Sequence, residues 1–162
     1  MHVKIFTTGG TIDKVYFDAE SEFKVGPPQI DAILHDAKVK CDYAIETLLR
    51  KDSLDLTEAD RALIREHVAR DPIDRVLITH GTDTMVETAR VLQDVKDKTI
   101  VLVGSLSPAR FKNTDALFNI GFAFAAVQLL PPGVYVAMHG CVYDPLRVRK
   151  NRERNEFEED RG

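Results

Sequence analysis

The sequence predicts a doubly wound α/β domain, with a mostly parallel sheet and helices on both faces. Apolar, β-rich runs alternate along the chain with segments of helical periodicity, and the runs are nearly unbroken. Unbroken apolar strands are typical of a parallel sheet that is covered on both faces. The 162 residues, 44% of them hydrophobic, suffice for one domain with a real core. We therefore expect a single domain over residues 1–162 that ends in a polar tail over residues 155–162.

The predicted strands are apolar runs that end in polar or glycine-bearing residues. They cover residues 2–7, 41–48, 75–80, 99–104 and 133–140. Residues 14–26 have the pattern of two short strands around an acidic turn, which predicts a flap-like hairpin.

The predicted helices cover residues 28–38, 56–70, 84–95 and about 113–130. The second has Thr57 as its N-cap and ends before an Asp-Pro pair. The third starts with Thr84 and Glu87 at the spacing of a capping box. A Pro-Pro pair ends the fourth.

Composition excludes several classes of protein. A net charge of -4 argues against a nucleic acid or an anionic membrane as the main partner. The basic run "RVRKNRER" is followed at once by "EFEED", a pattern typical of a solvated segment. Cys41 and Cys141 have no spacing that suggests zinc or a redox pair. No apolar run reaches membrane-spanning length and none resembles a signal peptide, so we expect a cytoplasmic, soluble protein.

Polar segments follow the predicted parallel strands where ligands usually bind. In open α/β sheets that place is the crevice outside the carboxyl ends of the strands. The segments there are "TTGGTIDK", "RKDSLD", "HGTDT" and "GSLSPAR". The order of elements therefore predicts a site at this edge of the sheet.

The segment "TTGGT" has three interpretations. Its glycines, Gly10 included, suit a tight turn, and successive N–H groups could also bind an anion. A nucleotide site would favour GxGxxG or GxxxxGK[ST], and neither pattern occurs. In the third interpretation Thr11 is a nucleophile, which requires a neighbouring base. The local motif leaves the turn and the nucleophile open.

The segment "HGTDT" is either a simple helix cap or a site at a helix start that favours a carboxylate or oxyanion. In a site, Asp83 could receive a cationic amine. His80 is typical of a structural histidine, because no second ligand stands at metal-binding spacing.

Two further side chains are candidates with ordinary alternatives. Lys150 lies among arginines, as surface lysines often do, but would suit a base if it turned inward. Ser53 could offer its hydroxyl or N–H to a ligand carboxylate, or could simply be a turn serine.

Together, "TTGGTI" and "HGTDTM" resemble the two signatures of the bacterial-type L-asparaginase family. "KDSLDLT", "NTDALFNI" and "VRKN" match in the same order, so the resemblance covers residues 2 to about 152. It implies a threonine amidohydrolase that converts L-asparagine to L-aspartate and ammonia through an acyl-enzyme. Thr11 resembles the nucleophile, and Thr82, Asp83 and Lys150 resemble a second triad. The resemblance implies no metal and no organic cofactor.

The resemblance also implies a set of substrate-binding residues, in which Ser53 would hold the α-carboxylate and Asp83 the α-ammonium. The full set is Gly10, Ser53, Leu54, Asp55, Gly81, Thr82 and Asp83. Leu54 stands where the family often has a glutamine. Phe23 stands where the family has its flexible-loop tyrosine, so Tyr16 is predicted to serve as the catalytic phenol.

The chain looks like a short form of the family that lacks the C-terminal domain. An acidic residue of that domain, from a neighbouring subunit, usually helps to hold the substrate amine. A homo-oligomer, dimer or tetramer, is therefore expected. The alternatives are a non-catalytic module that binds an amino acid in the same pocket and, more weakly supported, a nucleotide-binding module.

Overall fold

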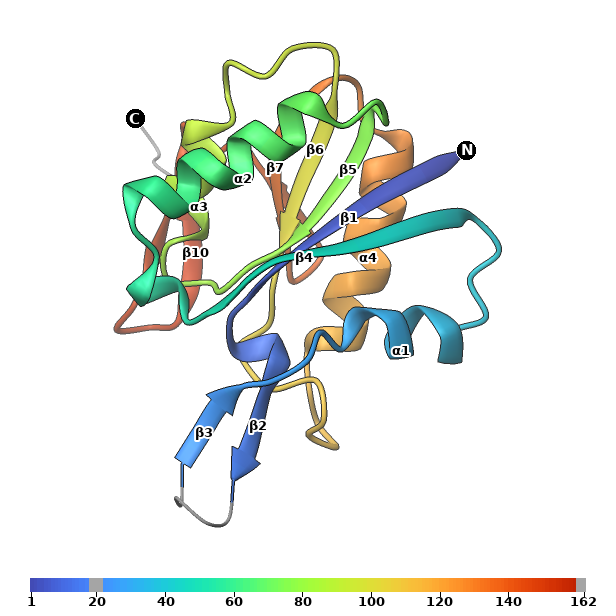
Figure 1. Cartoon of the computed structure of the whole chain (residues 1–162). Helices are drawn as coiled ribbons and strands as arrows, with labels where there is room; N and C mark the ends of the chain where they lie inside the picture. Colours follow the sequence, from blue (N-terminus) through green and yellow to red (C-terminus); the bar gives the residue numbers. More distant parts are fainter. Residues whose placement is uncertain (18–21, 160–162) are drawn as a thin grey trace.

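A six-stranded sheet forms the centre of the molecule (Figure 1). The computed structural model describes residues 1–17 and 22–159. The strand order is β4-β1-β5-β6-β7-β8, and every pairing is parallel except that of β7 with β8. The strands are β1 (His2–Gly9), β4 (Asp42–Lys51), β5 (Arg75–Thr79), β6 (Thr99–Val103), β7 (Gly133–Met138) and β8 (Cys141–Tyr143). The predicted doubly wound fold is confirmed, and the antiparallel edge strand β8 is an addition to it.

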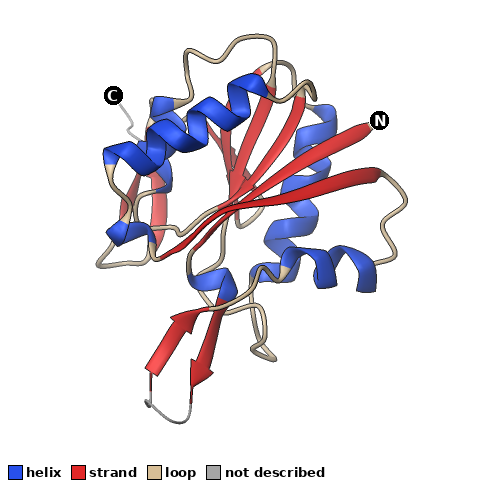
Figure 2. Cartoon of the chain, viewed as in Figure 1, coloured by secondary structure: helices blue, strands red, loops and turns tan. Residues whose placement is uncertain are grey.

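Four α-helices cover the two faces of this sheet (Figure 2). Helices α2 (Glu58–Arg70) and α3 (Met85–Val91) lie on one face, and α1 (Ile30–Asp36) and α4 (Ala116–Leu129) on the other. The apolar side chains of β5 and β6 between them are fully buried, as unbroken apolar runs require. No helix within the described ranges is long and apolar enough to span a membrane.

One of the two predicted helix caps is confirmed. The Thr57 Oγ1 accepts from the Asp60 N–H at 3.2 Å, and the Asp60 carboxylate accepts from the Thr57 N–H at 2.9 Å. The predicted Thr84–Glu87 box is wrong, because Thr84 Oγ1 instead donates to the Ser53 carbonyl at 2.7 Å. The hydrogen bond to a residue distant in sequence thus replaces the local cap. Helix α3 ends at Val91, earlier than predicted.

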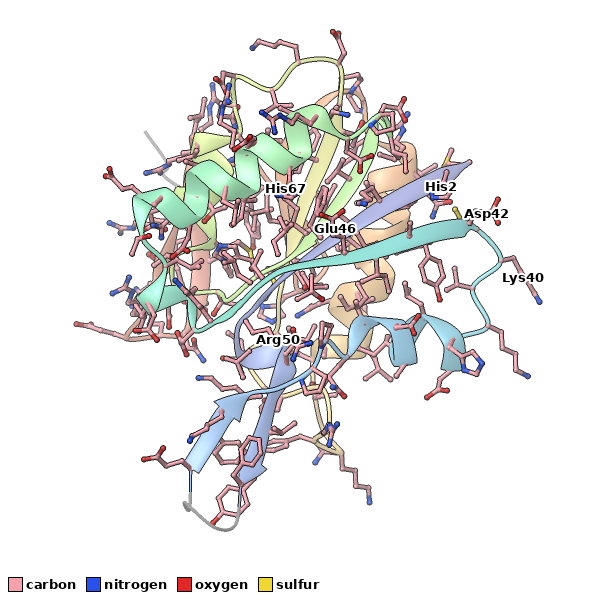
Figure 3. All side chains as sticks on the ribbon, viewed as in Figure 1. His2, Lys40, Asp42, Glu46, Arg50 and His67 are labelled. Atoms are coloured by element: carbon pink, nitrogen blue, oxygen red, sulfur yellow. The ribbon has the colours of Figure 1, made fainter. Side chains whose placement is uncertain are left out.

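A charged cluster ties α2 to β1 and β4. Lys4 Nζ lies 2.6 Å from Glu46 and 3.2 Å from Asp71. His67 Nδ1 contacts the same Glu46 at 3.1 Å, and Figure 3 shows these two side chains side by side. The hydrogen bond from Lys4 is the largest cause that lowers the pKa of Glu46. The cluster fixes α2 in place over the edge strand β4.

Two small antiparallel ribbons flank the sheet. The predicted hairpin is present as β2 (Lys14–Phe17) and β3 (Glu22–Val25), and its acidic turn lies outside the described residues. The second ribbon pairs β9 (Val148–Asn151) with β10 (Glu156–Glu159). The prediction of a polar tail from residue 155 is therefore wrong over β10. Phe157 is the physical reason, because it is 8% exposed and stacks on Tyr143 with ring centroids 6.0 Å apart.

Candidate active site

The candidate site lies where the winding of the sheet reverses. Strand β1 sits between β4 and β5, and the helices that follow β1 and β5 cover opposite faces. Connections that leave in opposite directions open a crevice at the carboxyl ends of two neighbouring strands. "TTGGT" leaves β1 at this point and "HGTDT" leaves β5, so the topology brings the two motifs together.

Gly10 and Gly81 form the contact between these motifs. Gly10 has a φ of +92°, and a Cβ on it would lie 2.4 Å from the Gly81 N. A Cβ on Gly81 would in turn lie 2.6 Å from the Ser53 Oγ. Two backbones and a serine therefore meet closely where only glycine fits.

The loop after β4 completes this arrangement. It carries the 3-10 turn η2 (Ser53–Asp55), and Ser53 is buried. Gly10 N donates to the Lys51 carbonyl at 2.9 Å, and Lys14 Nζ pairs with Asp52 at 2.7 Å. Three loops from three adjacent strands are thus packed into one site, as the sequence predicts.

We expect Gly10→Ala to lower the free energy of unfolding by at least about 2 kcal/mol and to abolish any activity of the site. The methyl group would enter the Gly81 backbone, and the positive φ disfavours alanine. Urea denaturation of both proteins measures the change.

The matched control for this prediction is Gly121→Ala on α4. A Cβ there meets no atom within 4 Å. This substitution should raise the free energy of unfolding by about 0.5–1 kcal/mol. Equal effects of the two substitutions would contradict the proposed packing of Gly10.

Lys150 turns inward from β9 and joins Thr82 and Asp83. Its Nζ lies 2.6 Å from Thr82 Oγ1 and 2.7 Å from Asp83 Oδ1, and its side chain is 6% exposed. The expectation of a solvated segment is therefore wrong at this residue. A lysine held against a buried threonine hydroxyl is in position to exchange a proton with it.

Thr11 begins the 3-10 turn η1 (Thr11–Asp13) directly after Gly10 and is half-buried. Asp13, which the sequence analysis did not single out, anchors this turn. Its carboxylate accepts from the Gln29 N–H at 2.9 Å, and its carbonyl accepts from the Gly26 N–H at 2.8 Å. The turn of Thr11 is thereby tied to the base of the hairpin and to the start of α1.

Burial raises the pKa of Asp13 to about 7 from an ordinary value of 3.8. The Gln29 N–H and the charge of Arg50, on β4 (Figure 3), oppose this rise. The folded state therefore binds the proton more tightly than the unfolded state does. The contribution of Asp13 to stability is greatest below pH 4 and is lost as the pH rises toward 7.

Asp13→Asn should remove this dependence on pH. Relative to the variant, the wild type is expected to lose about 2–4 kcal/mol of unfolding free energy between pH 4 and pH 7. Urea denaturation of both proteins across this range, with the exposed Asp36→Asn as control, measures the difference. A constant difference between wild type and Asp13→Asn would contradict the prediction.

Three predicted site residues are exposed. Tyr16 is 51% exposed on β2, and its ring packs on Phe23 with centroids 5.3 Å apart. Leu54 and Asp55 lie on the exposed side of η2. The roles of these three residues stay predictions.

His80 has the structural role that its sequence context predicts. The ring is fully buried, with Nδ1 2.7 Å from the Gly81 carbonyl and Nε2 2.7 Å from Thr88 Oγ1. A carbonyl only accepts, so Nδ1 donates and Nε2 accepts from the threonine hydroxyl. Burial lowers the pKa of His80 to about 4, which keeps the ring neutral.

Comparison with known proteins identifies the family. The family model described as "Asparaginase, N-terminal" matches residues 2–158. The chain belongs to the asparaginase family. The N-terminal match includes both glycine motifs, the Ser53 loop and Lys150, so the family assignment and the packed site concern the same residues.

Individual relatives within the asparaginase family agree with this assignment. The L-asparaginase of Thermococcus kodakarensis is 32% identical over 159 residues, which are 93% of this chain and 48% of the relative. The probable periplasmic L-asparaginase of Haemophilus influenzae is 31% identical over 92% of this chain and 46% of its own length. A solved structure of the T. kodakarensis enzyme matches with a TM-score of 0.84 and 28% identity, over 98% of this chain and 51% of that one. The chain thus spans about half the length of these relatives.

Proposed function

We propose that this chain is an L-asparaginase that hydrolyses L-asparagine to L-aspartate and ammonia. The observation that carries the proposal is the contact of Lys150 with Thr82 and Asp83, next to the turn that carries Thr11. A buried lysine, a hydroxyl and a carboxylate beside a second, half-buried threonine suit nucleophilic attack on an amide. Membership of the asparaginase family supports the same reaction class.

In the proposed reaction, Thr11 Oγ attacks the carboxamide carbon of the substrate side chain. Its proton passes to a base, with Tyr16 as the predicted acceptor, and then to the departing nitrogen, which leaves as ammonia. Water next attacks the acyl-enzyme, giving L-aspartate and restoring the Thr11 hydroxyl. Lys150 would activate Thr82 or this water by taking a proton. No step requires a metal or an organic cofactor.

Substrate binding would use the groups around the glycine contact. Asp83 is 32% exposed, so its carboxylate can reach an α-ammonium group while one oxygen stays on Lys150. Ser53, held by Thr84 against Gly81, would bind the α-carboxylate. The distance between these anchors and Thr11 would select asparagine over glutamine, whose extra methylene misplaces the carboxamide. Ammonia release from both amides, measured side by side, tests this choice.

The second candidate function is a binding module that holds an amino acid without turnover. It is favoured by the position of Tyr16, which is 51% exposed on β2. Asparagine that raises the melting temperature without release of ammonia would establish this function. Turnover that depends on Thr11 would exclude it.

A homo-oligomer, dimer or tetramer, and a cytoplasmic location belong to the same proposal. Leu117, Phe118 and Leu129 on α4 are 57%, 62% and 82% exposed, and such an apolar surface is typical of a contact between copies. Sedimentation velocity at micromolar concentration should show an oligomer. A monomer with full activity would contradict the proposal.

A further inference from the structure

A small cleft lies between α3 and β9, next to the Lys150 contacts of the candidate site. Its volume is about 220 Å³, and Lys150 and Asp83 form part of its wall. Thr11, Ser53 and Gly81 do not line it, so it is distinct from the crevice around Thr11, although it shares Asp83 and Lys150 with the candidate site. The segment around Arg152, which the asparaginase reaction leaves without a role, forms the other side.

The charge of this cleft is opposite to that of the chain. Its charged lining consists of Arg90, Arg149, Lys150, Arg152, Asp83 and Glu87. Four cations and two carboxylates line it, and Arg149 also pairs with Glu158 at 3.4 Å, so the formal net charge of these groups is +1, whereas the whole chain carries -4. The local field therefore favours an anion where the protein as a whole repels one.

Neutral carbonyl groups orient two of these arginines. Arg90 donates to the carbonyls of Pro145 at 2.9 Å and Val148 at 3.2 Å. Arg152 donates to the Asp83 carbonyl at 3.4 Å. These contacts fix the guanidinium groups without neutralising their charge, and each group has five N–H donors in all. Both arginines therefore keep donors for an oxyanion in the cleft.

We propose that this cleft binds a small oxyanion with two negative charges, such as the phosphate group. Planar guanidinium groups bind phosphate oxygens through paired hydrogen bonds, which suits this chemistry. The volume is below the roughly 300–1,000 Å³ of pockets for drug-sized ligands, so the site takes a free ion or one terminal phosphate. The chain binds this anion whether or not it hydrolyses asparagine.

The bound anion would also act on Lys150, a consequence that rests on the proposed function. A negative charge beside Lys150 stabilises its ammonium form and opposes its use as a base. Phosphate is thus expected to inhibit by lowering kcat for asparagine.

Titration calorimetry with inorganic phosphate at constant ionic strength tests the binding. Arg152→Gln is expected to raise the dissociation constant for phosphate about tenfold, because it removes a charged donor from the cleft. Glu87→Gln is expected to lower this dissociation constant several-fold, because it removes a carboxylate that repels the anion. Arg147→Gln is the matched control, since this arginine is 80% exposed and does not line the cleft, and should leave binding unchanged.

Two further arms identify the source of the anion. Acetate at the same ionic strength should not bind, because it carries one charge. Adenosine monophosphate that displaces inorganic phosphate would assign the site to a terminal phosphate group, and failure to displace it would assign the site to the free ion.

The proposal is overturned if wild type shows no saturable phosphate binding below about 10 mM, or if Arg147→Gln weakens binding as much as Arg152→Gln. If phosphate inhibits ammonia release by the wild type but not by Arg152→Gln, the result would support the proposed effect of the bound anion on Lys150. If the chain binds phosphate but releases no ammonia from asparagine, the proposal of an anion site is supported and the asparaginase proposal is contradicted.

Discussion

Thr11→Ala should abolish the release of ammonia from L-asparagine, with a loss of at least about 10³-fold in kcat. The predicted acyl-enzyme needs the Thr11 oxygen, and Thr11 directly follows Gly10 at its close contact with Gly81. The side chain is half-buried and packs at the start of a short turn, so the fold should survive the change. A coupled ammonia assay and a thermal melt measure the two effects separately.

Thr11→Ser is the matched control, because it keeps the hydroxyl and loses only a methyl group. It should retain measurable turnover, whereas Thr11→Ala should retain none above background. Undiminished turnover by Thr11→Ala would exclude Thr11 as the nucleophile. Turnover by neither the wild type nor the serine variant, with stabilisation by asparagine, would establish the binding module instead.

Lys150→Met should reduce kcat for asparagine by about 10²–10⁴-fold, the usual contribution of a general base. Methionine keeps an unbranched side chain of similar length in the buried position but can neither take nor give a proton. The substitution also leaves Thr82 Oγ1 and Asp83 Oδ1 without the amine that contacts both. Steady-state kinetics over a range of pH measures the loss.

Lys96→Met is the control for Lys150→Met, because Lys96 is exposed and donates to the carbonyl of Gln93 at 3.3 Å. It should leave kcat unchanged. A loss at Lys150 that added ammonium or methylamine restores would support a role in proton transfer. A loss explained entirely by a lower melting temperature would contradict that role.

The centre of the sheet could be predicted because β5, β6 and β7 are nearly unbroken apolar runs. Residues such as Ile78 and Leu102 have no exposed surface. Because the sheet buries these side chains completely, the apolar runs in the sequence predict the strands directly. Strands β8, β9 and β10 could not be predicted in the same way. Strand β8 has only three residues, and β9 and β10 are mostly polar. A few contacts, such as Phe157 on Tyr143, hold them in place.

The candidate site could be predicted as far as motifs at strand ends allow. The order of "TTGGT", "KDSLD" and "HGTDT" placed Gly10, Ser53 and Gly81 at one edge, and the structure brings these residues into contact. The direction of Lys150 and the contact of Thr84 with Ser53 depend on residues far apart in sequence. Asp13 could not be predicted, because its contact with the start of α1 involves residues distant in sequence and has no local sequence pattern.

The ribbon of β9 and β10 sets a practical limit on how the gene can be shortened. Lys150 is oriented by a strand whose only paired neighbour is β10, within the part of the chain that the structure describes. An expression product that stopped before Glu156 would keep every signature residue and still lose the scaffold of Lys150. Affinity tags, fusion partners and reporter domains should therefore be joined beyond Glu159, and a minimal fragment that keeps the Lys150 contacts has to include it.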